Sequence, residues 1–311
     1  MLKVLSSRSD VRGANISWRH RLARLVRRHP LITFLVVFNT FGQALVFTPV
    51  IAPSVYGVAL DRELVIIVAT VLFLLLPALV ITRVSWGPDG LRTLLRSMVH
   101  FKIRWQWYLL PLLVMPALTL VATLSAPPGG LSASGLAMAY LTAYLPALLF
   151  QFVTTNWWEE TAWMGFVQAP LQQRFGAWKA VLLTTPFFAL AHISAVFDGT
   201  FLQGLVKFLL LTVLVIPIRA LLAWVYNRTG SIAFVGLVHA ASNASALSLV
   251  PALYHRTGDA GLPFLVIAIA VIALSRGRLQ PRHGTASTPA NSATCAPTPL
   301  AGPAKQPSAP R

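Results

Sequence analysis

Eight apolar blocks, separated by short polar segments, constrain this chain more than any other feature of its sequence. A helix needs about 20 mostly apolar residues to cross the hydrocarbon core of a bilayer. Most of the blocks approach that length, so the sequence predicts an all-α, polytopic membrane helix bundle of about eight transmembrane helices. The blocks cover residues 31–51, 64–81, 108–124, 145–171, 177–196, 205–225, 231–250 and 262–274.

The composition excludes an ordinary soluble protein. Hydrophobic residues make up 56% of the chain and charged residues 11%, against roughly 25% charged residues in soluble domains. So few charges cannot cover a soluble surface. The single cysteine, Cys295, excludes a disulfide framework and a cysteine-based metal cluster.

The net charge of +17 is distributed as membrane topology requires. Basic residues follow every even-numbered apolar block and are sparse after the odd-numbered ones, which predicts that both termini lie inside. This placement favours topology control over nucleic-acid binding. We expect a basic cytoplasmic arm at 1–29, a transmembrane domain at 30–276 and a disordered tail rich in Pro, Ala, Ser and Thr at 277–311. Segment 86–107 reads as an amphipathic interfacial helix.

Ionisable residues inside apolar blocks are costly and indicate a functional site. Glu159 and Glu160 lie in the fourth block, His192 in the fifth, and His239 with Asn243 in the seventh. At a rise of about 1.5 Å per residue, these helices place Glu159 about 18 Å, His192 about 22 Å, His239 about 14 Å and Asn243 about 20 Å from their inner ends. All four depths fall near the middle of a core about 30 Å thick.

These residue types suit hydrolysis inside the bilayer. A glutamate in a pocket of low dielectric can act as a general base on water, and a histidine beside it can orient that water. A second histidine and an asparagine can donate hydrogen bonds to a developing oxyanion. A zinc site on Glu159, His192 and His239 is the alternative, although the chain lacks an HExxH motif.

Three motifs in order resemble the CPBP family of intramembrane proteases, which includes type II CAAX prenyl endopeptidases and bacteriocin self-immunity proteins. The family motifs EExxxR, FxxxH and HxxxN correspond here to Glu159-Glu160, to Phe188 with His192, and to His239 with Asn243. The resemblance covers about residues 80–250, with a motif-bearing core at about 145–250. It implies that Glu159 and His192 activate water, that His239 and Asn243 stabilise the oxyanion, and that Glu160 and Phe188 support them.

One position departs from the family pattern. The family arginine is Met164 here, four residues after Glu160. An arginine at that spacing would pair with Glu160 on one helix face. Without it, Glu160 either finds another cation, for which Arg219 is a candidate, or stays protonated.

The leading hypothesis is an intramembrane endopeptidase of the bacterial plasma membrane that cleaves a membrane-associated or lipidated peptide or protein substrate. The expected partners are that substrate and the lipid bilayer, with no nucleic acid. No cofactor is expected, and zinc is the alternative. A non-catalytic membrane scaffold of the same fold is the second hypothesis. A proton-coupled transporter, with Glu159 and Glu160 in a proton relay, is the third.

Overall fold

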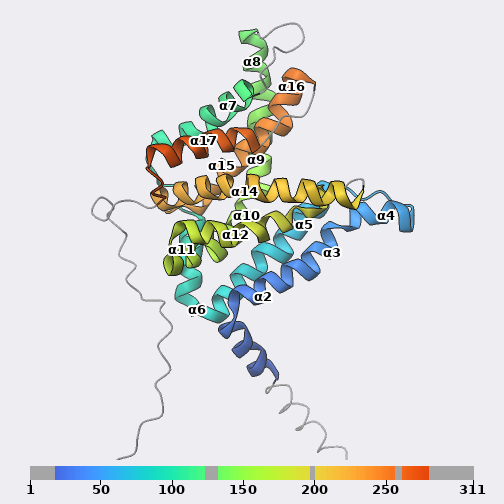
Figure 1. Ribbon diagram of the computed structural model, residues 1–311, viewed down its shortest axis with the longest axis vertical. Coiled ribbons are helices and arrows are strands. Elements are labelled where there is room, and N and C mark those ends of the chain that lie inside the picture. The colour runs from blue at the N-terminus through green and yellow to red at the C-terminus, as the bar shows by residue number, and fades with distance from the viewer. Residues whose placement is uncertain (1–17, 123–131, 197–199, 256–260, 280–311) are drawn as a thin grey trace, which may run out of the picture. The chain divides into compact units, whose positions relative to one another are not determined.

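A computed structural model describes residues 18–122, 132–196, 200–255 and 261–279 of the chain, and throughout these residues every regular element is helical (Figure 1). The predicted all-α class is therefore confirmed. The predicted tail falls mostly outside the described residues, as do residues 1–17 of the predicted arm. The rest of that arm forms a helix over residues 18–28.

The first half of the chain forms three helical runs, in which α-helical, π-helical and 3-10 segments follow one another. The first run consists of α2 (Pro30–Val37), η1 (Phe38–Gly42), α3 (Gln43–Val46) and α4 (Thr48–Tyr56). The second consists of α5 (Arg62–Ala69), η2 (Thr70–Leu75) and α6 (Leu76–Met98). The third consists of η3 (Trp105–Tyr108), η4 (Leu110–Val114) and α7 (Met115–Ala122).

The second half begins with one long helical run that contains the paired glutamates. Its segments are α8 (Ala133–Ala139), η5 (Tyr140–Tyr144), α9 (Leu145–Gln151), η6 (Phe152–Asn156), α10 (Trp157–Glu160), η7 (Thr161–Gln168) and α11 (Ala169–Phe175). The remaining elements are α12 (Ala177–Ala191), α13 (Ile193–Val196), α14 (Phe201–Thr229), α15 (Ile232–Ala244), η8 (Ser245–Leu249), α16 (Val250–Tyr254) and α17 (Gly261–Leu274).

Within the described residues, five helices are long and apolar enough to cross a membrane. They are Pro30–Ala52, Arg62–Met98, Ala133–Phe175, Phe201–Thr229 and Ile232–Tyr254. Two shorter apolar helices, Trp105–Val121 and Ala177–Ala191, and the 14 residues of α17 coincide with the other predicted blocks. The chain is thus a polytopic helical membrane protein, while the count of eight spans and the inside location of both termini stay predictions.

The interfacial segment differs from its prediction as one helix over 86–107. Gly87 adopts φ 71° and ψ −166° and precedes Pro88, so the backbone bends there inside α6. A positive φ suits glycine, and proline cannot continue a preceding helix smoothly, which explains the bend. The helix ends at Met98, and only the four residues of η3 are helical in the rest of the segment.

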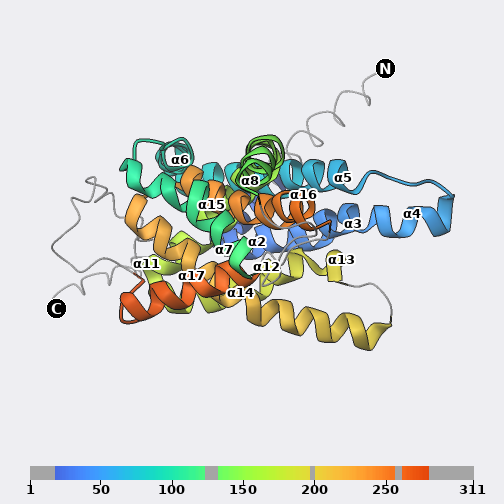
Figure 2. The ribbon, with the colours of Figure 1, turned by 90° about the horizontal axis from the view of Figure 1, so that it is seen from above.

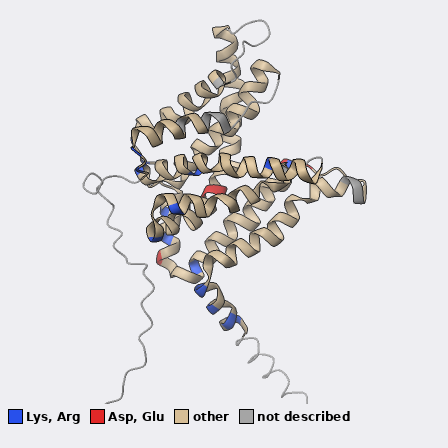
Figure 3. Ribbon diagram, in the orientation of Figure 1, with Lys and Arg blue, Asp and Glu red and all other residues tan. Residues whose placement is uncertain are grey.

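The helix of α15, η8 and α16 occupies the centre of the bundle. In Ile232–Tyr254, 78% of the apolar window is buried, against 22% to 39% in the other four long helices. It packs against α7, α9, α10 and α14 (Figure 1 and Figure 2). Figure 3 shows that the paired glutamates of α10 lie inside the protein. The basic residues of the helix over residues 18–28 lie apart from them. The central helix therefore meets the segment that carries the glutamates.

Gly236 permits this close approach of α15 to α10. A Cβ atom at Gly236 would lie 2.9 Å from the Cα atom of Trp157 and 3.1 Å from the carbonyl oxygen of Asn156. Both atoms belong to the backbone and cannot move aside as a side chain does. Small residues at such crossings allow membrane helices to pack closely.

Gly236→Ala is expected to push α15 away from α10 and to destabilise the protein by about 1–3 kcal/mol, as other overpacking substitutions do. The measurement is thermal unfolding of the purified protein in detergent. The control is Gly135→Ala on α8, an exposed position where the added Cβ would meet only the hydroxyl group of Ser132. Equal unfolding temperatures of Gly236→Ala and the wild type would contradict the close crossing.

Candidate active site

The glutamate pair lies at the junction of two helical segments. Glu159 and Glu160 end α10, and the eight-residue π-helical segment η7 follows directly. Both side chains are buried, and Glu160 is 0% exposed. The predicted continuation of this helix to residue 171 is confirmed, since the run reaches Phe175. The carboxylates therefore lie within the protein and not at a helix end.

Arg219 of α14 binds Glu160. Its Nη1 donates to both carboxylate oxygens of Glu160 at 2.9 Å. Its Nε and Nη2 donate to Oε1 of Gln168, at 2.8 and 2.6 Å. Arg219 is itself 0% exposed. Burying an ion pair is favourable only when further hydrogen bonds satisfy its remaining polar atoms, and Gln168 supplies two of these.

Of the two alternatives for Glu160, the structure shows a cation, Arg219, which lies on a different helix from the one that carries the arginine in the family pattern. Met164, at the family position, is fully buried in the hydrophobic core. Although Met164 replaces the family arginine, Glu160 still pairs with a cation. That cation is Arg219, the candidate partner named from the sequence.

His239 of α15 contacts both glutamates. Its Nδ1 lies 3.0 Å from Oε1 of Glu160 and 4.0 Å from Oε2 of Glu159. A carboxylate paired with Arg219 is an acceptor, so Nδ1 of His239 donates to it. Because Nδ1 carries this proton, Nε2 of His239 can donate to an oxyanion only in the imidazolium form.

Asn156 connects Glu159 to Asn243. Its Nδ2 donates to Oε2 of Glu159 at 3.2 Å, and its Oδ1 accepts from Nδ2 of Asn243 at 3.3 Å. Within the described ranges, neither Lys nor Arg forms an ion pair with Glu159. The two carboxylates of the pair therefore differ: Arg219 neutralises Glu160, and amide and imidazole groups surround Glu159.

His192 reaches this cluster through Phe188. The Phe188 ring centroid lies 4.8 Å from that of His192 and 6.0 Å from that of His239. The guanidinium carbon of Arg219 lies 5.0 Å from the same centroid. Phe188 thus packs against both histidines and the arginine, although no hydrogen bond joins His192 to Glu159 in the part of the chain that is described.

The prediction that His192 lies within a spanning helix is wrong, because α12 ends at Ala191. The Nδ1 atom of His192 lies 2.8 Å from the carbonyl oxygen of Phe188, while its backbone N–H bonds to Ala189. The ring thus takes the acceptor that the backbone N–H would use in a continuing helix. Since a carbonyl only accepts, Nδ1 carries the proton, and in neutral His192 Nε2 is an acceptor.

The zinc alternative gains no support from this geometry. Across the described residues, no group of three or more His, Cys, Asp or Glu side chains is placed to hold a metal ion. Glu160 is occupied by Arg219, and the Nδ1 atoms of both histidines are engaged by protein oxygens.

Two buried amides were missed by the sequence reasoning. Asn156 and Gln168 are 1% and 0% exposed and hold Glu159 and Arg219 by hydrogen bonds. Each is an uncharged polar residue inside an apolar block, three residues before Glu159 and eight after Glu160. That placement was the available signal, because buried polar groups require partners.

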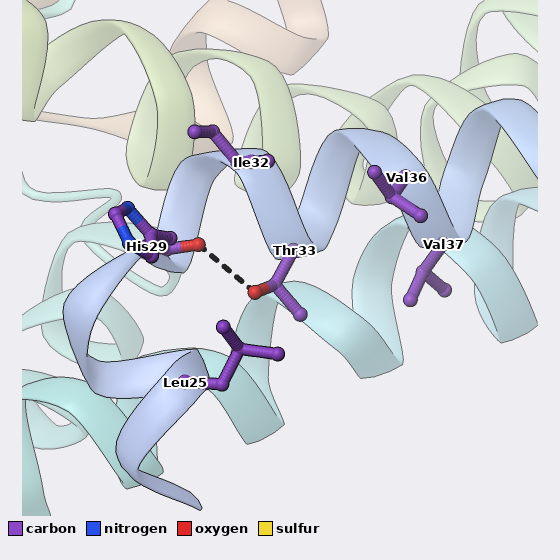
Figure 4. Close-up of a pocket in the computed structure, with 6 residues that line it drawn as sticks. All are labelled: Leu25, His29, Ile32, Thr33, Val36 and Val37. Atoms are coloured by element: carbon purple, nitrogen blue, oxygen red, sulfur yellow. Dashed lines mark hydrogen bonds between the residues drawn. The ribbon is translucent and has the colours of Figure 1, made fainter. Parts of the chain in front are cut away.

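A hollow elsewhere in the protein is separate from this cluster. It has a volume of about 300 Å³ and lies along the start of α2 (Figure 4). Two of its lining residues are joined by a hydrogen bond, in which the hydroxyl group of Thr33 donates to the backbone carbonyl oxygen of His29. None of the cluster residues lines it; the lining consists of Leu25, His29, Ile32, Thr33, Val36 and Val37.

The fold and the cluster define an all-helical integral membrane protein with a buried carboxylate pair, a neutralising arginine and two histidines. Residues 141–245 match the family model described as type II CAAX prenyl endopeptidase Rce1-like. The match includes all three motifs and confirms the resemblance over that segment. It implies CAAX-type intramembrane proteolysis in general terms. No curated protein matches the chain.

Proposed function

We propose that this protein is an intramembrane endopeptidase that hydrolyses a peptide bond of a membrane-associated or lipidated substrate with water activated by Glu159 and His192. The observation that carries the proposal is the unequal environment of the glutamate pair. Arg219 neutralises Glu160, whereas Glu159 is held by Asn156 and lies beside His239. One carboxylate can therefore stabilise the cluster while the other accepts a proton.

In this mechanism, Glu159 takes a proton from water as the oxygen attacks the scissile carbonyl carbon, and His192 orients that water through Nε2. The C–N bond of the tetrahedral intermediate then breaks, and Glu159 gives its proton to the leaving amine. His239 in the imidazolium form, together with Asn243, donates hydrogen bonds to the oxyanion. Glu160 orients His239 by accepting from Nδ1, and Phe188 holds the two imidazole rings apart.

The proposal also covers the route of the substrate and the membrane in which the enzyme resides. The substrate approaches from the bilayer as a peptide or protein anchored to the membrane, and the enzyme resides in the bacterial plasma membrane. The reaction needs no metal ion, because carboxylate, imidazole and amide groups supply the base and the oxyanion donors.

The test is cleavage of a library of fluorogenic lipidated peptides by the purified protein in detergent, with and without a chelator. We expect cleavage that survives chelation and falls by about 10²–10⁴-fold in His192→Ala, the usual contribution of general acid–base catalysis. His29→Ala, which removes an exposed histidine distant in the sequence from the motifs, is the control and should retain activity.

Two results would contradict the proposal. Loss of cleavage with the chelator, restored by zinc, would replace the metal-free mechanism with a metal site. Absence of cleavage across the library by a protein with an intact cooperative unfolding transition would favour a non-catalytic scaffold.

A further inference from the structure

His192 lies at a break between two helices, and the carbonyl groups around that break need donors. The last carbonyls of a helix have no partner within the helix. At the end of α12, the His192 ring and backbone N–H take the carbonyls of Phe188 and Ala189. In a membrane protein, the remaining carbonyls must also be satisfied by protein groups wherever water is excluded.

Two side chains from the first half of the chain supply donors on either side of His192. Nε2 of Gln43, at the start of α3, donates to the carbonyl oxygen of Leu190 at 2.6 Å. Nη2 of Arg62, at the start of α5, donates to the carbonyl oxygen of Ser194 at 3.2 Å. The two acceptors are two residues before and two residues after His192. Together, these bonds hold both sides of the break.

The donors come from helices that pack against each other. The segments α3 and α5 are in contact, and η2, which continues α5, contacts α10. Gln43 is only 8% exposed, and its Nε2 must face Leu190 because a carbonyl only accepts. Asp61 caps α5 by accepting from the backbone N–H of Leu64, which fixes the helix start next to Arg62.

We propose that Gln43 and Arg62 are positioning residues that hold the α12–α13 break, and with it the imidazole of His192, in place. Both lie outside residues 141–245, the segment that matches the protease family. The first two helical runs therefore contribute to the site through His192. The effect on cleavage rests on the proposed function, but the effect on His192 itself does not.

The first test measures His192 without any substrate. The purified protein is treated with diethyl pyrocarbonate, and modification of each histidine is followed by mass spectrometry. In Gln43→Met, which keeps the side-chain length and removes the donor, His192 should react about fivefold faster, the ratio expected for one lost hydrogen bond. Arg62→Leu should act in the same direction, and Arg62→Lys should restore a rate near that of the wild type.

The matched control is Asn39→Leu. Asn39 is also an amide in the first helical run, but its Nδ2 donates to Leu35 of its own helix. This change should leave the reactivity of His192 unchanged. Exposed His29 provides an internal standard, since its rate should be equal in all variants.

The second test measures cleavage. Gln43→Met and Arg62→Leu should lower kcat by about 10-fold to 100-fold, as expected for a misplaced group near the reaction, and leave KM unchanged. Faster His192 modification without cleavage by any form of the protein would support the positioning role and reject the proposed function. Normal His192 modification and normal kcat in both variants would overturn the positioning role and leave the proposed function intact.

Discussion

Arg219→Met is expected to destabilise the protein by about 3–5 kcal/mol, as the loss of one partner of a buried ion pair does. Glu160 is 0% exposed and receives two hydrogen bonds from Arg219. Without the guanidinium group, a carboxylate remains buried with no cation beside it, and Gln168 loses both of its donors. Cleavage should disappear as well, because Arg219 holds the Glu160 carboxylate that orients His239. The measurement is denaturant or thermal unfolding in detergent, together with the peptide assay.

A second substitution separates charge from packing. In Glu160→Gln with Arg219→Met, both charges are absent, so most of the lost stability should return. Cleavage should stay low, since the Glu160 carboxylate no longer accepts a hydrogen bond from Nδ1 of His239. Arg92→Met, which breaks an exposed ion pair with Asp89, should change the free energy of unfolding by less than about 1 kcal/mol. If Arg219→Met changed the free energy of unfolding by a similarly small amount, the burial of Glu160 would not depend on Arg219.

Glu159→Gln is expected to lower kcat by about 10²–10⁴-fold, the usual contribution of a general base. The amide keeps the shape of the carboxylate and can still accept a hydrogen bond from Asn156, but it cannot take a proton from water. Its stability should remain close to that of the wild type, because no ion pair with Lys or Arg is lost in the described part of the chain. Initial rates on the best library peptide, beside the unfolding temperature, provide the measurement.

Glu63→Gln is the matched control for this change. Glu63 lies in the first turn of α5 and is exposed, so its amide variant should retain cleavage. Full activity in Glu159→Gln would remove the general-base role. Wild-type function in cells that carry only Glu159→Gln would favour the scaffold hypothesis.

The helices and the glutamate–histidine contact could be predicted from local features of the sequence. Long apolar blocks dictate helices wherever the backbone must bond to itself, and the described helices coincide with all eight blocks. Glu159, Glu160 and His239 were noticeable because ionisable residues are rare in such blocks. Arg219 could be named as a candidate partner for Glu160 by the same reasoning, since a buried carboxyl group either pairs with a cation or stays protonated.

The features that escaped prediction depend on contacts between distant segments. At the end of α12, His192 and Gln43 bond to the last carbonyl groups and Arg62 bonds to Ser194 beyond it, and no glycine or proline marks this end. The bend in segment 86–107 is different, because Gly87-Pro88 was a local signal for it. Gln168 gains its role only when Arg219 of α14 donates to it, and Asn156, which holds Glu159 within its own helical run, gains its bond to Asn243 only when α15 packs there.

The separation of Glu160 from its cation has a consequence for biogenesis. In the family pattern the arginine follows the glutamates on the same helix, so the two charges can neutralise each other while that helix enters the bilayer. Here Arg219 is synthesised 59 residues after Glu160, on a later helix. During translation, Glu160 therefore precedes its cation and has no Arg219 beside it until α14 has been synthesised. Packing of α14 then supplies the cation for Glu160, and α15, which follows it in the chain, adds His239.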